Sequence, residues 1–175
     1  MDQTPPIPTL PLALADWITI TEVENGSFFA GALFTRKLGG PPPEFGRHIV
    51  VFYRREDGAY YPLSYLHFWR QDRIGLIGGA CTDGRVMRLM TPAQAQALNA
   101  AGGMLHQTSL FAFSRFEEGL DAFFCRSGDT RARKVLFAAV FCQTSNEHLL
   151  IKRVKALQAD EEQALFEQAM ALGSF

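Results

Sequence analysis

Glycine and arginine are concentrated in one short segment near the middle of the chain, GGACTDGRVMR, at residues 78–88. Glycines allow a ligand to approach the backbone closely, and two arginines three residues apart could face one pair of phosphates. Backbone amides together with guanidinium groups commonly bind a pyrophosphate. The same composition also suits a turn at residues 82–84 flanked by two solvated arginines. If the segment binds an anion, its ligand-binding residues are Gly78, Gly79, Gly84, Arg85 and Arg88.

A second candidate for anion binding is RSGDTRAR, residues 126–133, where a Ser-Gly turn precedes a predicted helix. Arg131 and its neighbouring arginines would surround the positive end of that helix. The alternative is ordinary helix capping by Ser127 or Asp129. Because the Asp129 carboxylate would itself occupy the helix end, an anion would have to compete with it.

Cys81 follows two glycines at the expected end of a central strand, with Asp83 close behind it. A thiolate nucleophile needs a base, which His67 or His106 could supply if folding brings one of them near. The alternative is a buried, unreactive thiol. Cys81, Cys125 and Cys142 are an odd number at wide spacing, so they predict reduced thiols and neither a disulfide framework nor a metal site.

Four consecutive polar residues, His106 to Ser109, lie on a segment that we expect to be a buried strand, Met104–Phe113. One of them could act on an acceptor, and the alternative is hydrogen bonding within the sheet. His106 is the preferred proton donor or acceptor, because an imidazole titrates near neutral pH.

The elements that would position these residues alternate between strands and helices. Residues 1–15 predict an extended, proline-rich lead-in, and residues 16–175 predict a single domain. The expected strands lie at residues 17–21, 47–54, 60–69, 74–79, 104–113 and 149–151. The expected helices run from a cap at Asn25 or Ser27 to Gly39, and over residues 91–101, 115–125, 130–139 and 160–172. The three strands between residues 47 and 79 form an antiparallel meander.

This order of elements resembles the GCN5-related N-acetyltransferase (GNAT) fold, and the nearest local likeness is ARKVLFAAVFCQTSNEHLLIKRV, residues 132–154. In that family a helix ends in a Gly-Phe pair before the last two strands, and here Val140 and Phe141 stand at that place. The resemblance implies an α+β fold with a central, mostly antiparallel twisted sheet flanked by helices. It also implies acyl-CoA or acetyl-CoA as cosubstrate, bound through the residues of the first segment.

The chain departs from the family pattern at two places. The family's phosphate loop, an Arg or Gln followed by a Gly-x-Gly or Gly-x-Ala turn into a helix, is replaced by residues 78–88 in irregular form. The family often has a tyrosine as general acid five residues before the Phe, and here that residue is Leu136. Another group near the central strand would have to protonate the leaving thiolate, and the candidates are His106, Cys81 and Asp83.

Composition limits the function further. The 175 residues carry 17 basic and 18 acidic side chains, so no global field attracts nucleic acid or an anionic membrane. The N-terminal segment lacks a basic region, and its prolines interrupt a short apolar run, which predicts a cytoplasmic protein without signal peptide or membrane span.

Two functions follow from the sequence. The first is an acyltransferase that passes an acyl group from acyl-CoA to an amine on a small molecule or protein. The alternative is a non-catalytic ligand-sensing or protein-binding module on the same fold, which could dimerise through its aromatic sheet or its final helix.

Overall fold

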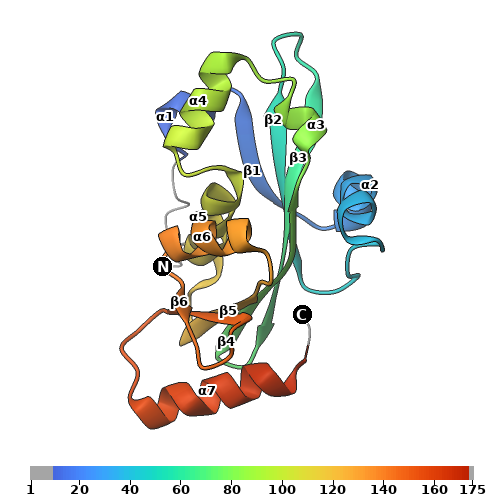
Figure 1. Ribbon diagram of the computed structural model, residues 1–175. Helices are drawn as coiled ribbons and strands as arrows, with labels where there is room; N and C mark the ends of the chain where they lie inside the picture. Colours follow the sequence, from blue (N-terminus) through green and yellow to red (C-terminus); the bar gives the residue numbers. More distant parts are fainter. Residues whose placement is uncertain (1–9, 174–175) are drawn as a thin grey trace, which may run out of the picture.

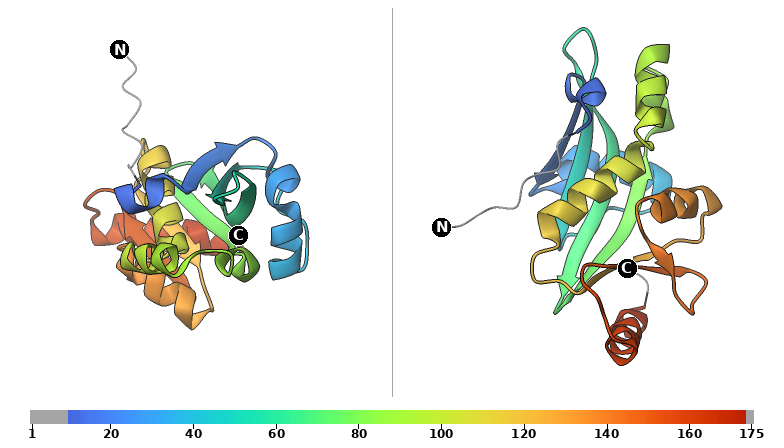
Figure 2. Two further views of the ribbon diagram at one scale, coloured as in Figure 1. Left: turned by 90° about the horizontal axis from the view of Figure 1, so that it is seen from above. Right: turned by 90° about the vertical axis from the view of Figure 1, so that its left-hand side faces the viewer.

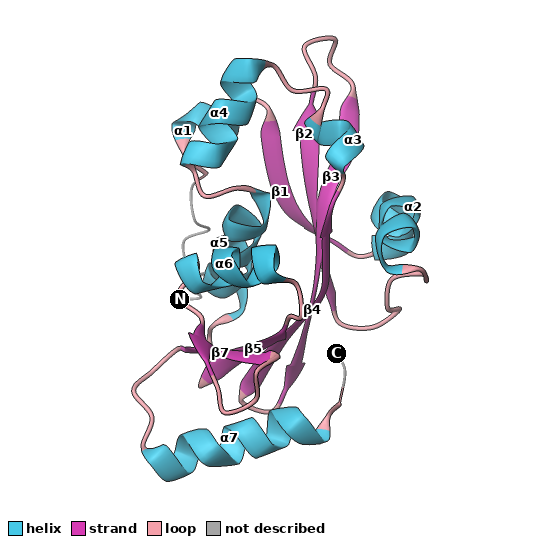
Figure 3. Cartoon of the chain, in the orientation of Figure 1, coloured by secondary structure: helices cyan, strands magenta, loops and turns pink. Residues whose placement is uncertain are grey.

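The computed structural model describes residues 10–173, which form one seven-stranded sheet with helices on both faces (Figures 1 and 3). The strands are β1 (Ile18–Val23), β2 (Arg47–Arg54), β3 (Tyr60–Gln71), β4 (Ile74–Thr82), β5 (Ala122–Arg126), β6 (Cys142–Gln143) and β7 (Leu149–Arg153). The helices are α1 (Leu12–Ala15), α2 (Gly26–Leu38), α3 (Gly84–Met87), α4 (Pro92–Ala100), α5 (Met104–Phe116), α6 (Thr130–Ala138) and α7 (Ala159–Ala171).

The strands are arranged in the order β1-β2-β3-β4-β5-β7-β6. Strands β1 to β4 form an antiparallel meander, and β5, β7 and β6 form a second antiparallel group. The two groups are joined by β4 and β5, which run parallel and are connected through α3, α4 and α5. The predicted α+β fold with a mostly antiparallel sheet is therefore confirmed.

Each face of the sheet buries its own apolar side chains. On one face Ile49, Leu66 and Ile77 pack with α5 and α6, and the neighbouring strand ends pack with α1 and α4. On the other face α2 covers Val50 and Tyr65, and α7 covers the lower part of the sheet around β5 and β7. In the right-hand view of Figure 2, α5 crosses in front of the strands and α2 lies behind them.

Several predicted helix boundaries are confirmed by their caps. The Asn25 side chain accepts a hydrogen bond from the Phe28 N–H at the start of α2, and Gly39 ends that helix in the left-handed conformation with φ of 86°. Thr91 and Gln94 form a capping box at the start of α4. Helix α7 begins one residue before the expected Asp160, with Gln158 as its cap.

The predicted strand over residues 104–113 and the predicted helix over residues 115–125 are both wrong. Residues 104–116 form helix α5, and residues 122–126 form the buried strand β5. Two of the polar side chains on α5 donate to backbone carbonyls, Thr108 Oγ1 to Met104 at 2.8 Å and Gln107 Nε2 to Ala101 at 2.5 Å. The extended lead-in is also wrong over Leu12–Ala15, which is helix α1, and residues 1–9 of that prediction lie outside the described part of the chain.

Candidate functional site

The sheet opens between its two parallel strands. Strands β4 and β5 are paired from Ile74 with Ala122 to Ile77 with Cys125, and the pairing ends there. Beyond this point β4 continues along β3 to Thr82, whereas β5 ends at Arg126 against β7. Residues 78–80 therefore have no strand partner on the β5 side, and their backbone groups on that side are available to a ligand.

A cleft of about 260 Å³ occupies this opening. Leu38 of α2 borders it from one face of the sheet, and Leu105 of α5 and Leu136 of α6 border it from the other. The cleft therefore has walls from helices on both faces of the sheet. Its remaining lining comes from the two strand ends and the turn into α6, namely Ile77, Gly78, Gly79, Ala80, Cys125, Arg126, Ser127, Gly128, Asp129 and Ala132.

Two longer helices begin next to the cleft, and their first turns differ. At α6 the Asp129 carboxylate accepts the Ala132 N–H at 2.6 Å, so the helix end already carries a negative charge. At α5 the N-cap is Gly103, with φ of 84° and no side-chain cap. The N–H groups of the first α5 turn, including that of Leu105, are therefore not capped by a side chain.

The residues predicted to bind an anion fall in three places. Gly78 and Gly79 line the cleft. Gly84 and Arg85 belong to the short helix α3, and Arg88 is its C-cap. These three residues do not line the cleft. Arg131 is exposed on α6, next to the cleft residue Ala132. The Gly102-Gly103 turn into α5 was missed, although two glycines directly before a helix are the signal for such a loop.

The three predicted catalytic residues do not line the cleft. Cys81 lies beneath α2, and burial raises the pKa of its thiol to about 11. Asp83 caps α3 through the Arg85 N–H at 2.9 Å and pairs with Arg36 at 2.5 Å. His106 lies on helix α5 rather than on the expected strand.

Two residues stand at positions where the resembling family has a characteristic tyrosine and glycine. Leu136, at the place of the family's tyrosine, is 2% exposed and lines the cleft, so no acid stands there. Val140, at the place of the family's glycine, has φ of 63°. This left-handed conformation suits glycine and is strained for a β-branched residue.

Two buried histidines lie on the α2 side of the sheet. His48 on β2 and His67 on β3 are direct cross-strand partners, and their rings lie 5.7 Å apart. His48 Nδ1 is 2.7 Å from the hydroxyl oxygen of Tyr65, and His67 Nε2 is 2.7 Å from the Phe45 carbonyl oxygen. The sequence did not single out His48, because a histidine in an apolar strand gives no sign of its partners.

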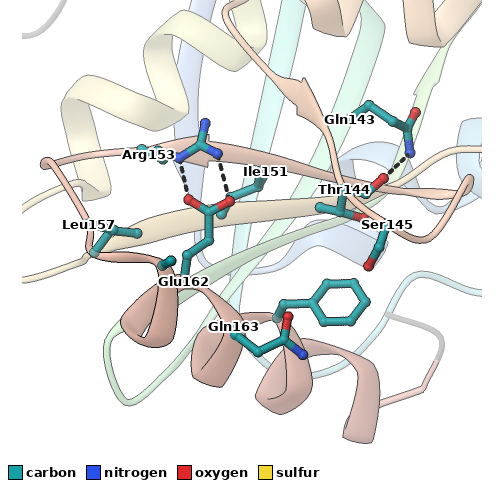
Figure 4. A pocket seen from close by; sticks show the side chains of 10 residues that line it. Gln143, Thr144, Ser145, Ile151, Arg153, Leu157, Glu162 and Gln163 are labelled. Atoms are coloured by element: carbon teal, nitrogen blue, oxygen red, sulfur yellow. Dashed lines mark hydrogen bonds and ion pairs between the residues drawn. The ribbon is translucent and has the colours of Figure 1, made fainter.

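A larger groove of about 520 Å³ lies between the β6–β7 edge and α7 (Figure 4). Across it Arg153 makes a two-pronged ion pair with Glu162, at 2.5 and 2.6 Å. The pair neutralises both charges, and the other side chains drawn in Figure 4 carry none. The groove lies on the α7 side, away from the strand opening, so it is not our candidate site.

Among known proteins, this chain resembles only solved structures, through its fold and not through its sequence. No family model matches the chain, and no curated protein matches it significantly. A solved structure of the KacTA–DNA complex shares 15% identity over 86% of this chain and 99% of that one, with a TM-score of 0.42. The ribosomal-protein-S18-alanine N-acetyltransferase from Escherichia coli shares 10% identity over 82% and 97%, with a TM-score of 0.46. AtaT complexed with acetyl-methionyl-tRNAfMet shares 11% over 85% and 99%, with a TM-score of 0.42.

The chain has a GNAT-like fold, in agreement with the resemblance seen in its sequence. The meander and the two final strands are those the resemblance implied, whereas the strand and the helix expected between residues 104 and 125 occur in the reverse order, as α5 and β5. Among residues 10–173, no helix has both the length and the hydropathy needed to cross a membrane. Within the same range, His, Cys, Asp and Glu do not gather in any group of three suited to a metal ion.

Proposed function

We propose that this chain binds an acyl-CoA donor in the cleft between β4 and β5 and transfers the acyl group to an amine. The opening of the sheet beyond Ile77 and Cys125 is the observation that carries the proposal. The pantetheine arm of the donor is an extended chain of two amides. It pairs with the free backbone edge at residues 78–80 as an added strand would.

The pyrophosphate of the donor lies against the first turn of α5. That turn presents backbone N–H groups without a side-chain cap, and it carries the positive end of a 13-residue helix. Leu105 in the same turn lines the cleft, so a ligand can contact the turn and the strand edge together. Arg131, exposed on α6 next to the cleft residue Ala132, adds a second, weaker attraction.

Thermal unfolding with and without acetyl-CoA tests the donor site. A ligand that binds only the folded chain stabilises it by about 2.7 kcal/mol at 100 times its dissociation constant. We expect a rise in Tm with acetyl-CoA and a smaller one with adenosine alone, which lacks both the pantetheine arm and the pyrophosphate. An unchanged Tm at millimolar acetyl-CoA would remove the proposal.

A binding module without catalysis is the second candidate, and one observation favours it. Leu136 lines the cleft where the family often has its tyrosine acid, and it has no group to donate a proton. Release of free CoA thiol, followed over a panel of primary amines, separates the two functions. Binding of acetyl-CoA without thiol release would favour the module.

A further inference from the structure

Strand β1 forms one end of the sheet, and only one of its two edges has a strand partner. The pairing with β2 is regular, from Ile18 with Tyr53 to Val23 with His48, and it has no register shift. Among residues 10–173, no other strand pairs with β1. The outer edge of this six-residue strand therefore presents backbone donors and acceptors that no strand uses.

The backbone groups on this free edge belong to alternate residues. The N–H of the last β2 residue donates to the Trp17 carbonyl oxygen at 2.8 Å, so Trp17 and every second residue after it point their backbone groups toward β2. Ile18, Ile20 and Glu22 consequently point theirs outward. The Glu22 carbonyl oxygen also accepts the Thr21 hydroxyl at 3.2 Å, which leaves it one lone pair for a partner.

These outward groups match those of a second copy of the same strand. In an antiparallel pair centred on Ile20, that residue lies opposite its own counterpart, and Ile18 lies opposite the partner's Glu22. Each such pair exchanges two hydrogen bonds, so the outward groups of all three residues are used. Thr19 then lies opposite the partner's Thr21 on the α2 face of the sheet. Cross-strand threonine pairs of this kind stabilise a sheet.

Charge does not oppose this pairing. On the α2 face, β1 presents two threonines and a valine. On the other face, Glu22 is the charged residue of the strand, and Arg47 and Arg115 of its own chain pair with it at 3.1 and 3.4 Å. The strand also lacks proline, lysine and a β-bulge, which are the features that usually protect a free edge.

Exposed aromatic rings lie beside the free edge. Phe28, at the start of α2, is 78% exposed and contacts Phe29, which is 40% exposed. Phe29 packs edge-on against Phe52, the cross-strand partner of Thr19. The rings therefore lie close to β1, on the face where the threonines of two copies would meet. Association through the edge would remove part of this aromatic surface from water, which stabilises the pair.

We propose that two copies of this chain associate through β1, in antiparallel register about Ile20, so that their sheets join into one. The same patch is used on both copies, as in the two-fold dimers that are commonest among protein oligomers. The inference does not depend on acyl transfer, because β1 contributes no residue to the cleft between β4 and β5. The interface is small, so we expect half-association between about 10 and 500 µM.

Charged substitutions where the two strands meet test the register. Thr19→Lys combined with Thr21→Lys places like charges opposite each other, and Thr19→Glu combined with Thr21→Glu does the same with the other sign. Each double variant alone should stay monomeric in sedimentation velocity, at concentrations where the wild type associates. An equimolar mixture of the two should form the dimer again, because lysines then face glutamates. This recovery also shows that both variants are folded.

Two further measurements address the aromatic patch and the backbone. Phe28→Ser should weaken association by about tenfold, because it removes an exposed ring beside β1. The matched control is Phe137→Ser, which removes a 42% exposed ring on α6 and should leave association unchanged. Raising the protein concentration should slow amide hydrogen exchange at Ile18, Ile20 and Glu22. The amide of Thr19, already directed to β2, should change much less.

A chain that stays monomeric up to about 500 µM would overturn the inference, and this is the outcome expected if the edge binds a strand of a different protein. A dimer that persists in both double variants would also overturn it, because the copies would then meet through another surface. Double variants that remain monomeric after mixing would contradict the register about Ile20.

Discussion

His48 lies with its Nδ1 2.7 Å from the Tyr65 hydroxyl oxygen and its ring 5.7 Å from that of His67, the two ring planes tilted by 33°. Burial is the cause that lowers the pKa of His48, and it is the largest cause that lowers the pKa of His67. The folded state thus binds fewer protons than the unfolded state at pH values below about 6.5. The free energy of unfolding should therefore fall as the pH drops from 6.5 through the two folded pKa values.

Urea unfolding at pH 7.5 and pH 5.0 measures this loss. The substitution His48→Asn keeps a polar atom near Nδ1 for Tyr65 and removes one titrating ring. It should reduce the difference in stability between the two pH values. An unchanged difference in this variant would show that other groups carry the acid sensitivity.

Val140 holds a left-handed backbone conformation while 62% exposed, so no packing compensates its strain. We expect Val140→Gly to raise the free energy of unfolding by about 0.5–1 kcal/mol, because relief of strain exceeds the added entropy of the unfolded chain. The control is Ala138→Gly at the end of α6, which should lower stability by a similar amount. Equal effects of the two substitutions would contradict the strain argument.

The three cysteines should differ in reactivity. Cys142 is exposed, whereas burial raises the pKa of Cys81 to about 11 and that of Cys125 to about 12. Because the thiolate is the reactive form, iodoacetamide at pH 7.5 should modify Cys142 first. Peptide mass analysis over time measures the order, and rapid modification of Cys81 would restore it as a nucleophile candidate.

The sequence predicted the meander and helices α2 and α4 because strong caps and turn residues mark their ends. It failed between residues 104 and 126 for two physical reasons. Gln107, Thr108 and Ser109 are polar yet buried in α5, and this hides the apolar stripe that normally indicates a helix. Phe123 and Phe124 fit helical spacing, but they lie on opposite faces of the buried strand β5.

The same failure explains what was missed in the candidate site. Because the sequence predicts a strand where α5 lies, it does not indicate that the Gly102-Gly103 turn precedes a helix. The glycine-rich segment at residues 78–88 was therefore the preferred phosphate-binding loop. Gly78 and Gly79 were predicted because glycines at a strand end indicate close backbone approach. The pairing of His48 with His67 depends on the register of β2 and β3, which residue types alone do not specify.

Filling the cleft should weaken donor binding without unfolding the chain. Ala132 lines the cleft from α6, whereas Ala138 on the same helix is exposed. Ala132→Phe should weaken acetyl-CoA binding by at least tenfold in calorimetric titration, because the ring occupies the ligand's space. Ala138→Phe introduces the same side chain outside the cleft and should bind normally. Similar affinities of the two variants would place the donor elsewhere.

A charge at Leu105 tests whether the pyrophosphate lies at the start of α5. Leu105 lines the cleft in the first turn of that helix, where a carboxylate is compatible with the helix dipole. Leu105→Glu should therefore fold, but its charge competes with the phosphates for the free N–H groups. Leu105→Gln has nearly the same shape without the charge, so the two variants share any loss of apolar contact.

We expect acetyl-CoA to bind the Glu variant about tenfold more weakly than the Gln variant at low ionic strength. The difference should shrink in 0.5 M salt, where charges are screened beyond a few ångströms. Equal affinities at low salt would move the pyrophosphate to another site, and Arg131→Ala would then test the α6 side of the cleft.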